Sequence, residues 1–295
     1  MLAKRIATVV VLLPFVFWLL FHADARQFTV SLSLIFTLAA WEWSQLMGLK
    51  QPSSRFAYVI FFQLVMLLII WLVPNLEFWP GDAKGHVFDH GLSIRNLPII
   101  IMLLGSIWWV INLFCLLVGL HDWLKGEKLI ALRALAGLLI LLPSWVALIS
   151  LHTESLRIGN EGDWLLLFVL LQIWAADTGA FFSGKQFGKT PLAPKVSPKK
   201  TWEGVLGGSL FALAVAYYSA ESFGVQTVSL VQLFSISITI IIFSIVGDLT
   251  ESIYKRQQNV KDSSNILPGH GGILDRIDSI TSAVPVFALV YFWFL

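Results

Sequence analysis

The chain has 295 residues, of which 57% are hydrophobic and only 13% are charged, with a mean hydropathy of +0.78. Soluble domains carry roughly 25% charged residues, so this composition excludes an ordinary soluble domain and predicts a membrane protein. The formal net charge of +2 gives no support for a nucleic-acid partner. The single cysteine, Cys115, excludes an intramolecular disulfide.

Nine apolar runs are long enough to cross a bilayer core of roughly 30 Å as helices. They lie near residues 6–21, 28–48, 56–73, 97–120, 134–151, 164–183, 204–220, 227–247 and 277–295. We therefore expect an all-α, polytopic membrane protein with about nine transmembrane helices. The first run also has an alternative as a secretory signal, because Lys4 and Arg5 precede it and Ala-Asp-Ala follows at 23–25. The charge distribution favours keeping it as a span.

Lysine and arginine are distributed unequally between alternate loops of this nine-span arrangement. If the N-terminus is cytoplasmic, that side holds sixteen of the 20 Lys and Arg, namely Lys4, Arg5, Lys50, Arg55, Lys125, Lys128, Arg133, Lys185, Lys189, Lys195, Lys199, Lys200, Lys255, Arg256, Lys261 and Arg276. The opposite side holds four, namely Arg26, Lys84, Arg95 and Arg157. Cytoplasmic loops are enriched in positive charge. We expect an integral membrane protein with its N-terminus on the cytoplasmic side and its C-terminus outside.

Polar residues divide the chain into two regions of one integral unit. Residues 1–151 hold about five spans with few polar groups, and residues 152–295 hold about four spans with the polar loops of a catalytic region. No internal repeat or low-complexity linker separates them. The clearest polar group of the first region is Glu42, which stands between two tryptophans. Its position is compatible with a structural role at a helix end and with a functional role facing a cavity.

The segment Val196–Gly204 is the first candidate site of the second region. It contains Ser197, Lys199, Lys200, Thr201 and Glu203, and Pro194 and Pro198 interrupt any continuous helix there. An ordinary cytoplasmic loop would account for the lysines alone, whereas the neighbouring hydroxyls and carboxylate favour a phosphate-binding loop. The pair Gly204 and Gly208 is more typical of helix packing than of chemistry.

Carboxylates and cations also gather around the last two predicted spans. Helical spacing puts Asp248, Ser252 and Lys255 on one face beside Glu251, and after the polar loop come Lys261, His270, Gly271, Gly272, Asp275, Arg276 and Asp278. The hard oxygens of Asp248 and Asp275 suit Mg²⁺, which also accepts substrate phosphates. No second histidine or cysteine accompanies His270 at ligand spacing, which disfavours softer metals. The glycines would let backbone N–H groups approach a phosphate.

The stretch "SIYKRQQNVKDSSNILPGHGGILDRID", Ser252–Asp278, resembles the signature of the phosphatidate cytidylyltransferases, also called CDP-diglyceride synthases. Its one departure is Tyr254, where an aliphatic residue or Phe is usual. "DTGAF", "SPKKTWEG" and "GDLTES" are similar to further blocks of the family, so that the resemblance covers roughly residues 172–279. A pattern this long is far more specific than a lone glycine motif.

The resemblance implies that the cytidylyl group of CTP is transferred to phosphatidate, which gives CDP-diacylglycerol and pyrophosphate in a Mg²⁺-dependent reaction. It implies catalytic roles for Asp248, Asp275 and Lys255, with metal binding by Asp248 and Asp275 and further candidates in Asp278 and Asp177. The implied substrate-binding residues are Ser197, Lys199, Lys200, Thr201, Glu203, Arg256, Lys261, His270, Gly271, Gly272 and Arg276. A second cation and a homodimer are compatible with this picture, and the expected partners are CTP, phosphatidate and the lipid bilayer.

Three alternatives remain open at this point. An ion-coupled transporter would place Asp177, Asp248 and Asp275 in a midplane ion site, although the acidic cluster is predicted at cytoplasmic helix ends and no inverted repeat is visible. A related CTP-dependent enzyme would act on another lipid, and an inactive family member would serve as a structural partner. His270 is equally compatible with orienting a phosphate and with a structural turn.

Overall fold

A computed structural model of the chain describes residues 2–73, 96–120, 129–158, 164–222 and 229–294. Within these ranges there are nine helices and one hairpin, namely α1 (Leu2–Phe21), α2 (Ala25–Leu46), α3 (Pro52–Leu72), α4 (Leu97–Leu117), α5 (Ile130–Ile158), α6 (Trp164–Phe187), β1 (Pro191–Ala193), β2 (Ser197–Thr201), α7 (Trp202–Ser222), α8 (Leu230–Gln257) and α9 (Leu274–Phe294). Each apolar run of the sequence coincides with one of these helices. The all-α class is confirmed, with a short hairpin added.

Five helices of the described residues are long and apolar enough to cross a membrane. They are α3, α4, α8, and the parts of α5 and α6 that span Ile130–Ser155 and Leu165–Phe187. The apolar part of α1 that is described, Thr8–Phe21, is shorter. The chain is therefore an integral membrane protein, and the count of nine spans stays a prediction.

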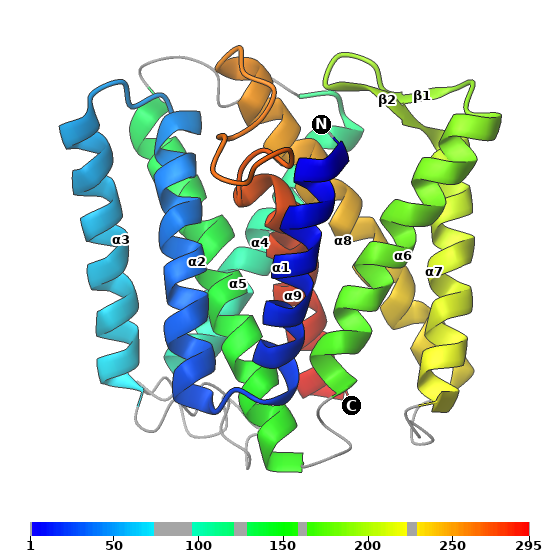
Figure 1. Ribbon diagram of the computed structural model, residues 1–295, viewed down its shortest axis with the longest axis horizontal. Helices are drawn as coiled ribbons and strands as arrows, with labels where there is room; N and C mark the ends of the chain where they lie inside the picture. The colour runs from blue at the N-terminus through cyan, green and yellow to red at the C-terminus, as the bar shows by residue number, and fades with distance from the viewer. Residues whose placement is uncertain (1, 74–95, 121–128, 159–163, 223–228, 295) are drawn as a thin grey trace.

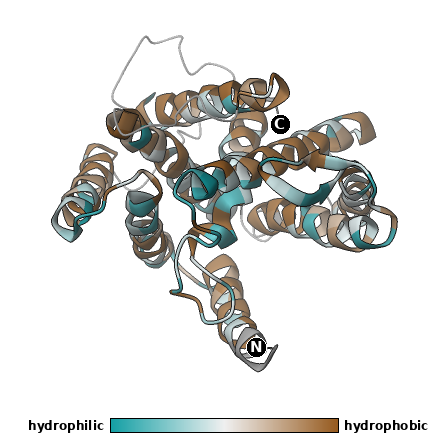
Figure 2. Cartoon of the chain, turned by 90° about the horizontal axis from the view of Figure 1, so that it is seen from above, coloured by the Kyte–Doolittle hydropathy of each residue, from teal (hydrophilic) through white to brown (hydrophobic). Residues whose placement is uncertain are grey.

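Successive helices run in alternate directions, so that the connections fall at two ends of the bundle. The N-terminus, the β1–β2 hairpin and residues 258–273 lie together at one end, and the C-terminus lies at the other (Figure 1). Seen from the first end, hydrophilic segments gather over the middle of the bundle (Figure 2). We call this the hairpin end.

The two ends of the bundle (Figure 1) correspond to the two sides of the membrane between which the predicted nine-span arrangement divides the Lys and Arg residues. Some of the charges counted there lie outside the described residues or have side chains that are not described, namely Lys4, Arg5, Lys84, Arg95, Lys125, Lys128 and Arg157.

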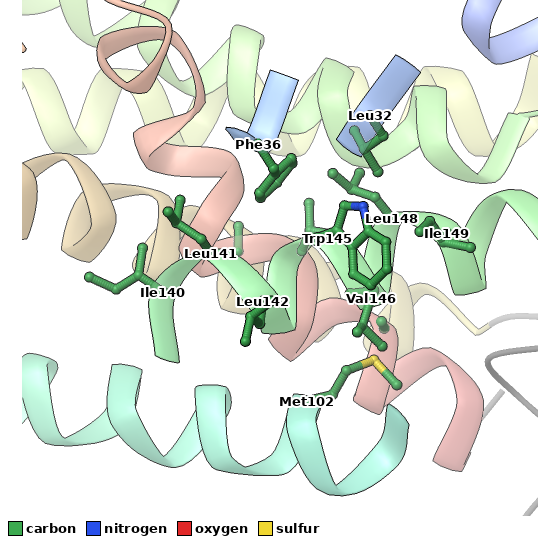
Figure 3. Packing of buried hydrophobic residues seen from close by; sticks show 14 of the residues in the cluster. Leu32, Phe36, Met102, Ile140, Leu141, Leu142, Trp145, Val146, Leu148 and Ile149 are labelled. Carbon is green, nitrogen blue, oxygen red and sulfur yellow. The ribbon is translucent and has the colours of Figure 1, made fainter. Parts of the chain in front are cut away.

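Helix α5 forms the centre of the core and packs against α2, α3, α4, α6 and α9. Leu141, Trp145 and Leu148 of α5 lie toward Phe36 of α2, and Val146 lies toward Met102 of α4, in one buried apolar cluster (Figure 3). Trp145 is fully buried, and its Nε1 donates to Ser33 Oγ of α2 at 3.1 Å. A polar group inside an apolar core needs such a partner, so this bond also fixes the position of α2 against α5.

Glycines allow α7 to pack closely on α6. A Cβ at Gly208 would lie 3.0 Å from Ala180 Cβ, and a Cβ at Gly204 would lie 3.1 Å from Ala180 O. Small residues at this spacing let two backbones approach in a membrane. The packing role predicted for this glycine pair is confirmed.

The basic segment forms an antiparallel hairpin, in which Pro191 pairs with Thr201 and Ala193 pairs with Ser197. The prolines exclude a helix here, as expected, but the strand pairing was not predicted. Thr201 Oγ1 accepts the Gly204 N–H at 3.1 Å and so caps the start of α7. The hairpin is thereby fixed to the helix that follows it.

Helix α8 extends beyond the apolar span predicted at 227–247. The expected span 227–247 ended before Asp248, whereas α8 continues to Gln257. No glycine or proline interrupts residues 248–257, and the helix stops where Asn259 takes a φ of 55°. Asp248 therefore lies beyond the apolar span but inside α8, in the helical segment that the spacing of Asp248, Ser252 and Lys255 predicts. Helix α9 begins at Leu274, next to the expected Ile273.

We expect Gly247→Val to destabilise the protein, because Gly247 is where α8 and α9 touch. A Cβ at this position would overlap Asp278 O and Ser282 Oγ. Overpacking of this kind costs roughly 1–3 kcal/mol, which corresponds to a fall of about 5 °C in the melting temperature in detergent. Ser235→Val on the exposed face of α8 is the matched control. Equal melting temperatures for the two variants would contradict the tight α8–α9 contact.

Candidate functional site

Charged side chains from the hairpin, α6, α8 and α9 gather toward the hairpin end of the bundle. The carboxylates are Asp177, Asp248, Glu251, Asp275 and Asp278, and the cations are Lys200, Lys255 and Arg276. The charge of Asp248 acts on both Asp177 and Asp278. Residues that are far apart in the sequence thus form one electrostatic network.

Lys200 and Asp248 form the ion pair that joins the hairpin to α8. Lys200 Nζ donates to Asp248 Oδ2, and Ser252 Oγ lies 3.5 Å from Asp248 Oδ1. The two charged side chains keep 29% and 28% of their surface exposed. The pair therefore remains accessible to a ligand that carries charge.

This ion pair lines a cavity of about 270 Å³ between α6, the hairpin, α7 and α8. We call it the polar pocket, and its polar lining consists of Asp177, Lys199, Lys200, Thr201, Ser244 and Asp248 together with Ser209. Lys199 is exposed and adds a second ammonium beside Lys200. A cavity with two ammonium groups and two carboxylates can hold a phosphate together with a cation.

Lys255 is the centre of a second, more buried group. Its Nζ lies 2.7 Å from Asp275 Oδ1 and 3.3 Å from Glu251 Oε2. The side chains are 12%, 6% and 5% exposed, respectively. The Glu251 carboxylate also faces that of Asp278. Several carboxylates from α8 and α9 thus gather around one ammonium group.

Asp275 also holds the loop that precedes α9. Its Oδ2 accepts the N–H of Ser263 at 2.9 Å and the N–H of Gly272 at 2.8 Å, and Ser263 Oγ lies 3.0 Å from the same oxygen. Oδ1 is paired with Lys255. Both oxygens of Asp275 are thus engaged by the protein itself.

Glu42 of α2 holds the same loop from the opposite side. Glu42 Oε1 accepts the Ile273 N–H at 2.9 Å, and Oε2 accepts the Leu274 N–H at 2.7 Å. The hydroxyls of Ser263 and Ser264 also donate to this carboxylate. Its side chain is fully buried. We call this arrangement the Glu42 clasp, and it resolves the two roles left open for Glu42 in favour of positioning the loop.

Ser263 links the two carboxylates that hold the loop. Its Oγ lies 3.0 Å from both Glu42 Oε2 and Asp275 Oδ2. A Cβ at Gly272 would overlap Ser263 Oγ and would lie 2.6 Å from Glu42 Oε2. Glycine is required at 272 because the backbone approaches the clasp so closely. The only sequence signal for this clasp was a carboxylate in an apolar run.

The backbone N–H groups of Gly271 and Gly272 are hydrogen-bonded within the loop before α9. Gly271 has a φ of +87°, which favours glycine, and its N–H bonds to Leu267 O at 3.2 Å. The Gly272 N–H bonds to Asp275, as described above. Binding of a phosphate by these N–H groups stays a prediction. His270 donates its backbone N–H to Leu267 O at 2.9 Å and so takes part in the turn.

The other predicted site residues lie around the polar pocket and the loop. Arg256 Nε donates to Val196 O at 3.4 Å and ties α8 to the hairpin. Ser197 lies in β2, and Lys261 is exposed after α8. Arg276 is exposed in the first turn of α9, where its charge acts on Asp177. Substrate binding by these residues stays a prediction.

Glu203 fixes the start of the hairpin segment. Its carboxylate accepts the backbone N–H groups of Thr190 and Lys189 at 3.2 Å and the Thr190 hydroxyl at 2.9 Å. Hydrogen bonds from its own backbone N–H and from Thr190 lower the pKa of Glu203 to about 2. Because the folded-state pKa lies below the ordinary value, this stabilisation is complete above the ordinary pKa and is lost as the pH falls toward 2.

The donor chemistry of the network fits a magnesium ion. Its carboxylate oxygens are the hard ligands that Mg²⁺ prefers. Among the described residues, no three Asp, Glu, His or Cys side chains converge as a ready-made metal site. Lys200 and Lys255 instead lie against Asp248 and Asp275. Metal binding would therefore require these ammonium groups to move or to share the carboxylates.

Fold and site together define an integral membrane protein with a cation-lined polar pocket at one end of a helical bundle. Residues 3–294 match the Cytidylyltransferase family. The chain is 37% identical to the phosphatidate cytidylyltransferase of Haemophilus influenzae, with 100% of both chains covered. It is 39% identical to the phosphatidate cytidylyltransferase of Pseudomonas aeruginosa, with 98% of this chain and 96% of the relative covered. The chain belongs to the cytidylyltransferase family.

We expect Glu42→Gln to loosen the loop before α9, because the amide replaces one acceptor oxygen with a donor that faces other donors. The lost charge-assisted bonds correspond to roughly 1.5–3 kcal/mol, so amide hydrogen exchange at residues 263–274 should accelerate by about tenfold or more. Hydrogen exchange with mass spectrometry measures this directly. Glu154→Gln, which alters another buried glutamate in α5, is the control. Unchanged exchange in the Glu42 variant would contradict the clasp.

Proposed function

We propose that the protein transfers the cytidylyl group of CTP to phosphatidate, producing CDP-diacylglycerol and pyrophosphate. The observation that carries this proposal is the accessible Lys200–Asp248 pair in the polar pocket, next to Lys199. Support also comes from full-length relatives at 37% and 39% identity that bear the name phosphatidate cytidylyltransferase. The relatives' names favour phosphatidate over another lipid and give no support to a transporter.

The reaction brings two polyanions together, so charge compensation is its main requirement. A phosphate oxygen of phosphatidate attacks the α-phosphorus of CTP in line, and pyrophosphate leaves. Lys199 and Lys200 bind and orient phosphate oxygens in the polar pocket. The phosphate monoester is already ionised near neutral pH, so no dedicated general base is needed. Lys255 holds the carboxylates of Glu251 and Asp275 in position through its two ion pairs.

Asp248 and Asp275 are the carboxylates that we propose to hold Mg²⁺, with Asp278 and Asp177 as further ligands for this ion or a second cation. Bound metal would neutralise phosphate charge on the attacking and leaving groups. Asp248 lies in the polar pocket, whereas Asp275 is bound by the loop and by Lys255. The proposal therefore assigns Asp275 two tasks, holding the loop and facing the metal.

The hairpin end is proposed to face the cytoplasm of a bacterial cell, because CTP is soluble and the predicted cytoplasmic loops carry most of the Lys and Arg. The lipid phosphate is then available at the inner leaflet surface. A homodimer stays a prediction, since the structure describes one chain.

The proposal is tested with purified protein in mixed micelles, radiolabelled CTP, phosphatidate and Mg²⁺. We expect labelled CDP-diacylglycerol from the unaltered protein and a loss on the order of 100-fold in kcat for Asp248→Asn, because the variant removes charge from the site where the phosphates meet. Asp24→Asn is the matched control, because Asp24 caps α2 at the other end of the bundle and Asn caps equally well.

Two results would count against this proposal. A folded Asp248→Asn protein with normal turnover at limiting Mg²⁺ would remove Asp248 from the site. Failure of the unaltered protein to form CDP-diacylglycerol, with turnover of a different lipid and CTP, would assign the fold to another substrate.

The orientation is tested by cysteine labelling in a variant in which Ala replaces Cys115. Lys195→Cys places an exposed thiol in the hairpin, and Arg26→Cys places one at the opposite end. A membrane-impermeant maleimide should label position 26 in intact spheroplasts and position 195 only after the membrane is opened. Labelling of position 195 from outside would reverse the orientation and separate the site from cytoplasmic CTP.

A further inference from the structure

Helix α1 stands at the edge of the bundle (Figure 2), and only its last turns, with Leu19 and Leu20, are buried in the core among the described residues. Large side chains along it are exposed, including Val11 at 70% and Leu13 at 47%. At the hairpin end, Thr8 Oγ1 of α1 donates to Pro268 O of the loop before α9 at 3.0 Å. Helix α1 is thus bonded to the loop before α9, and a space remains between this helix and the core.

That space is an apolar groove of about 470 Å³ between α1, α2, α5, α6 and α9. We call it the α1 groove. Its lining is aliphatic and aromatic along most of its length and includes Leu12, Val16, Leu32, Leu170 and Ile277. The charged or titratable members of the lining are His270 and Arg276, which both come from the hairpin end. The groove therefore has the polarity of a lipid, with one polar end and one apolar body.

The length of the groove corresponds to one leaflet. On α1 it is lined from Val9 to Leu20, which spans about 16 Å at the rise of an α-helix. The hydrocarbon core of a bilayer is roughly 30 Å thick. A groove that starts at the hairpin end and runs about half this distance matches an acyl chain of the adjacent leaflet.

The polar end of the groove is prepared for an anion and adjoins the polar pocket. Among the described residues, the Arg276 guanidinium makes no hydrogen bond or ion pair, and His270 Nδ1 is buried without a hydrogen-bond partner. Trp174 of α6 lines the groove, and Asp177, three residues further along the same helix, lines the polar pocket, so that the two cavities meet along one turn of α6. Arg276 and His270 can therefore donate to a phosphate that lies between the groove and the polar pocket.

We propose that the α1 groove seats an acyl chain of phosphatidate, with the lipid phosphate bound by Arg276 and His270 at its polar end. This inference rests on the proposed function and assigns a place to its lipid substrate. Hydrocarbon gains little by moving from a bilayer to an apolar groove, so the phosphate contact must provide the selectivity. A chain seated there would deliver its phosphate beside Asp177 and the polar pocket.

Filling the groove should lower the turnover of phosphatidate with long acyl chains and leave the turnover of phosphatidate with short chains unchanged. We expect Val16→Trp to lower kcat/KM for dioleoyl phosphatidate by about tenfold, because the indole occupies the path of the chain. Dihexanoyl phosphatidate, whose chains reach less deeply, and the KM for CTP should be unaffected. Val11→Trp, on the exposed face of the same helix, is the matched control. Equal long-chain kinetics for the two tryptophan variants would overturn the proposal while leaving the proposed reaction intact.

A binding experiment tests the seat without turnover. Phosphatidate with a diazirine in its acyl chain should crosslink to peptides of α1 and α9 in the unaltered protein, and Arg276→Gln should reduce this yield severalfold. Diazirine-labelled phosphatidylcholine should crosslink less. Equal yields for the two lipids would make the groove a site for any bilayer lipid and overturn the proposal. Selective crosslinking without product formation would support the seat and reject the proposed reaction.

Discussion

A buried carboxylate on α2 determines where the loop before α9 lies. The first N–H groups of a helix have no partner within the helix, and water cannot supply one in a buried position. Glu42 provides acceptors for Ile273 and Leu274, and the same carboxylate binds Ser263 and Ser264. Charge-assisted bonds to a fully buried group are strong but costly to break. The N-terminal region, which has few polar groups of its own, thereby positions the loop that contains the signature residues.

The site depends on pairs of charges that come from different elements. Asp248 is bound by Lys200 of the hairpin, and Asp275 is bound by Lys255 of α8. Burial alone would raise the pKa of Asp275, and its hydrogen bond to Lys255 lowers that pKa below the usual value. The ammonium groups lie against the carboxylates that we propose to hold Mg²⁺. Binding of the proposed ion would therefore require these ion pairs to open or to be shared.

The two cavities divide the molecule by polarity. The polar pocket lies between α6, the hairpin, α7 and α8, and the α1 groove lies between α1, α2, α5, α6 and α9. Helix α6 contributes to both, with Trp174 in the groove and Asp177 in the pocket. A soluble nucleotide and a membrane lipid must meet at one phosphorus atom. Helix α6 lies between the polar pocket and the apolar groove and lines both. The fold therefore brings a polar and an apolar cavity to the same helix, as the proposed chemistry requires.

Sequence alone determined the class of protein, the position of each helix and the residue types of the site, because apolar length and carboxylate chemistry are local properties. It did not determine the end of α8, since charged residues such as Lys255 and Arg256 continue a helix as well as they terminate a span. The strand pairing at Ser197 and the clasp at Glu42 were decided only by tertiary structure. Glu42 and Leu274 are more than two hundred residues apart, and the bond between them forms because the bundle brings the last turns of α2 to the start of α9.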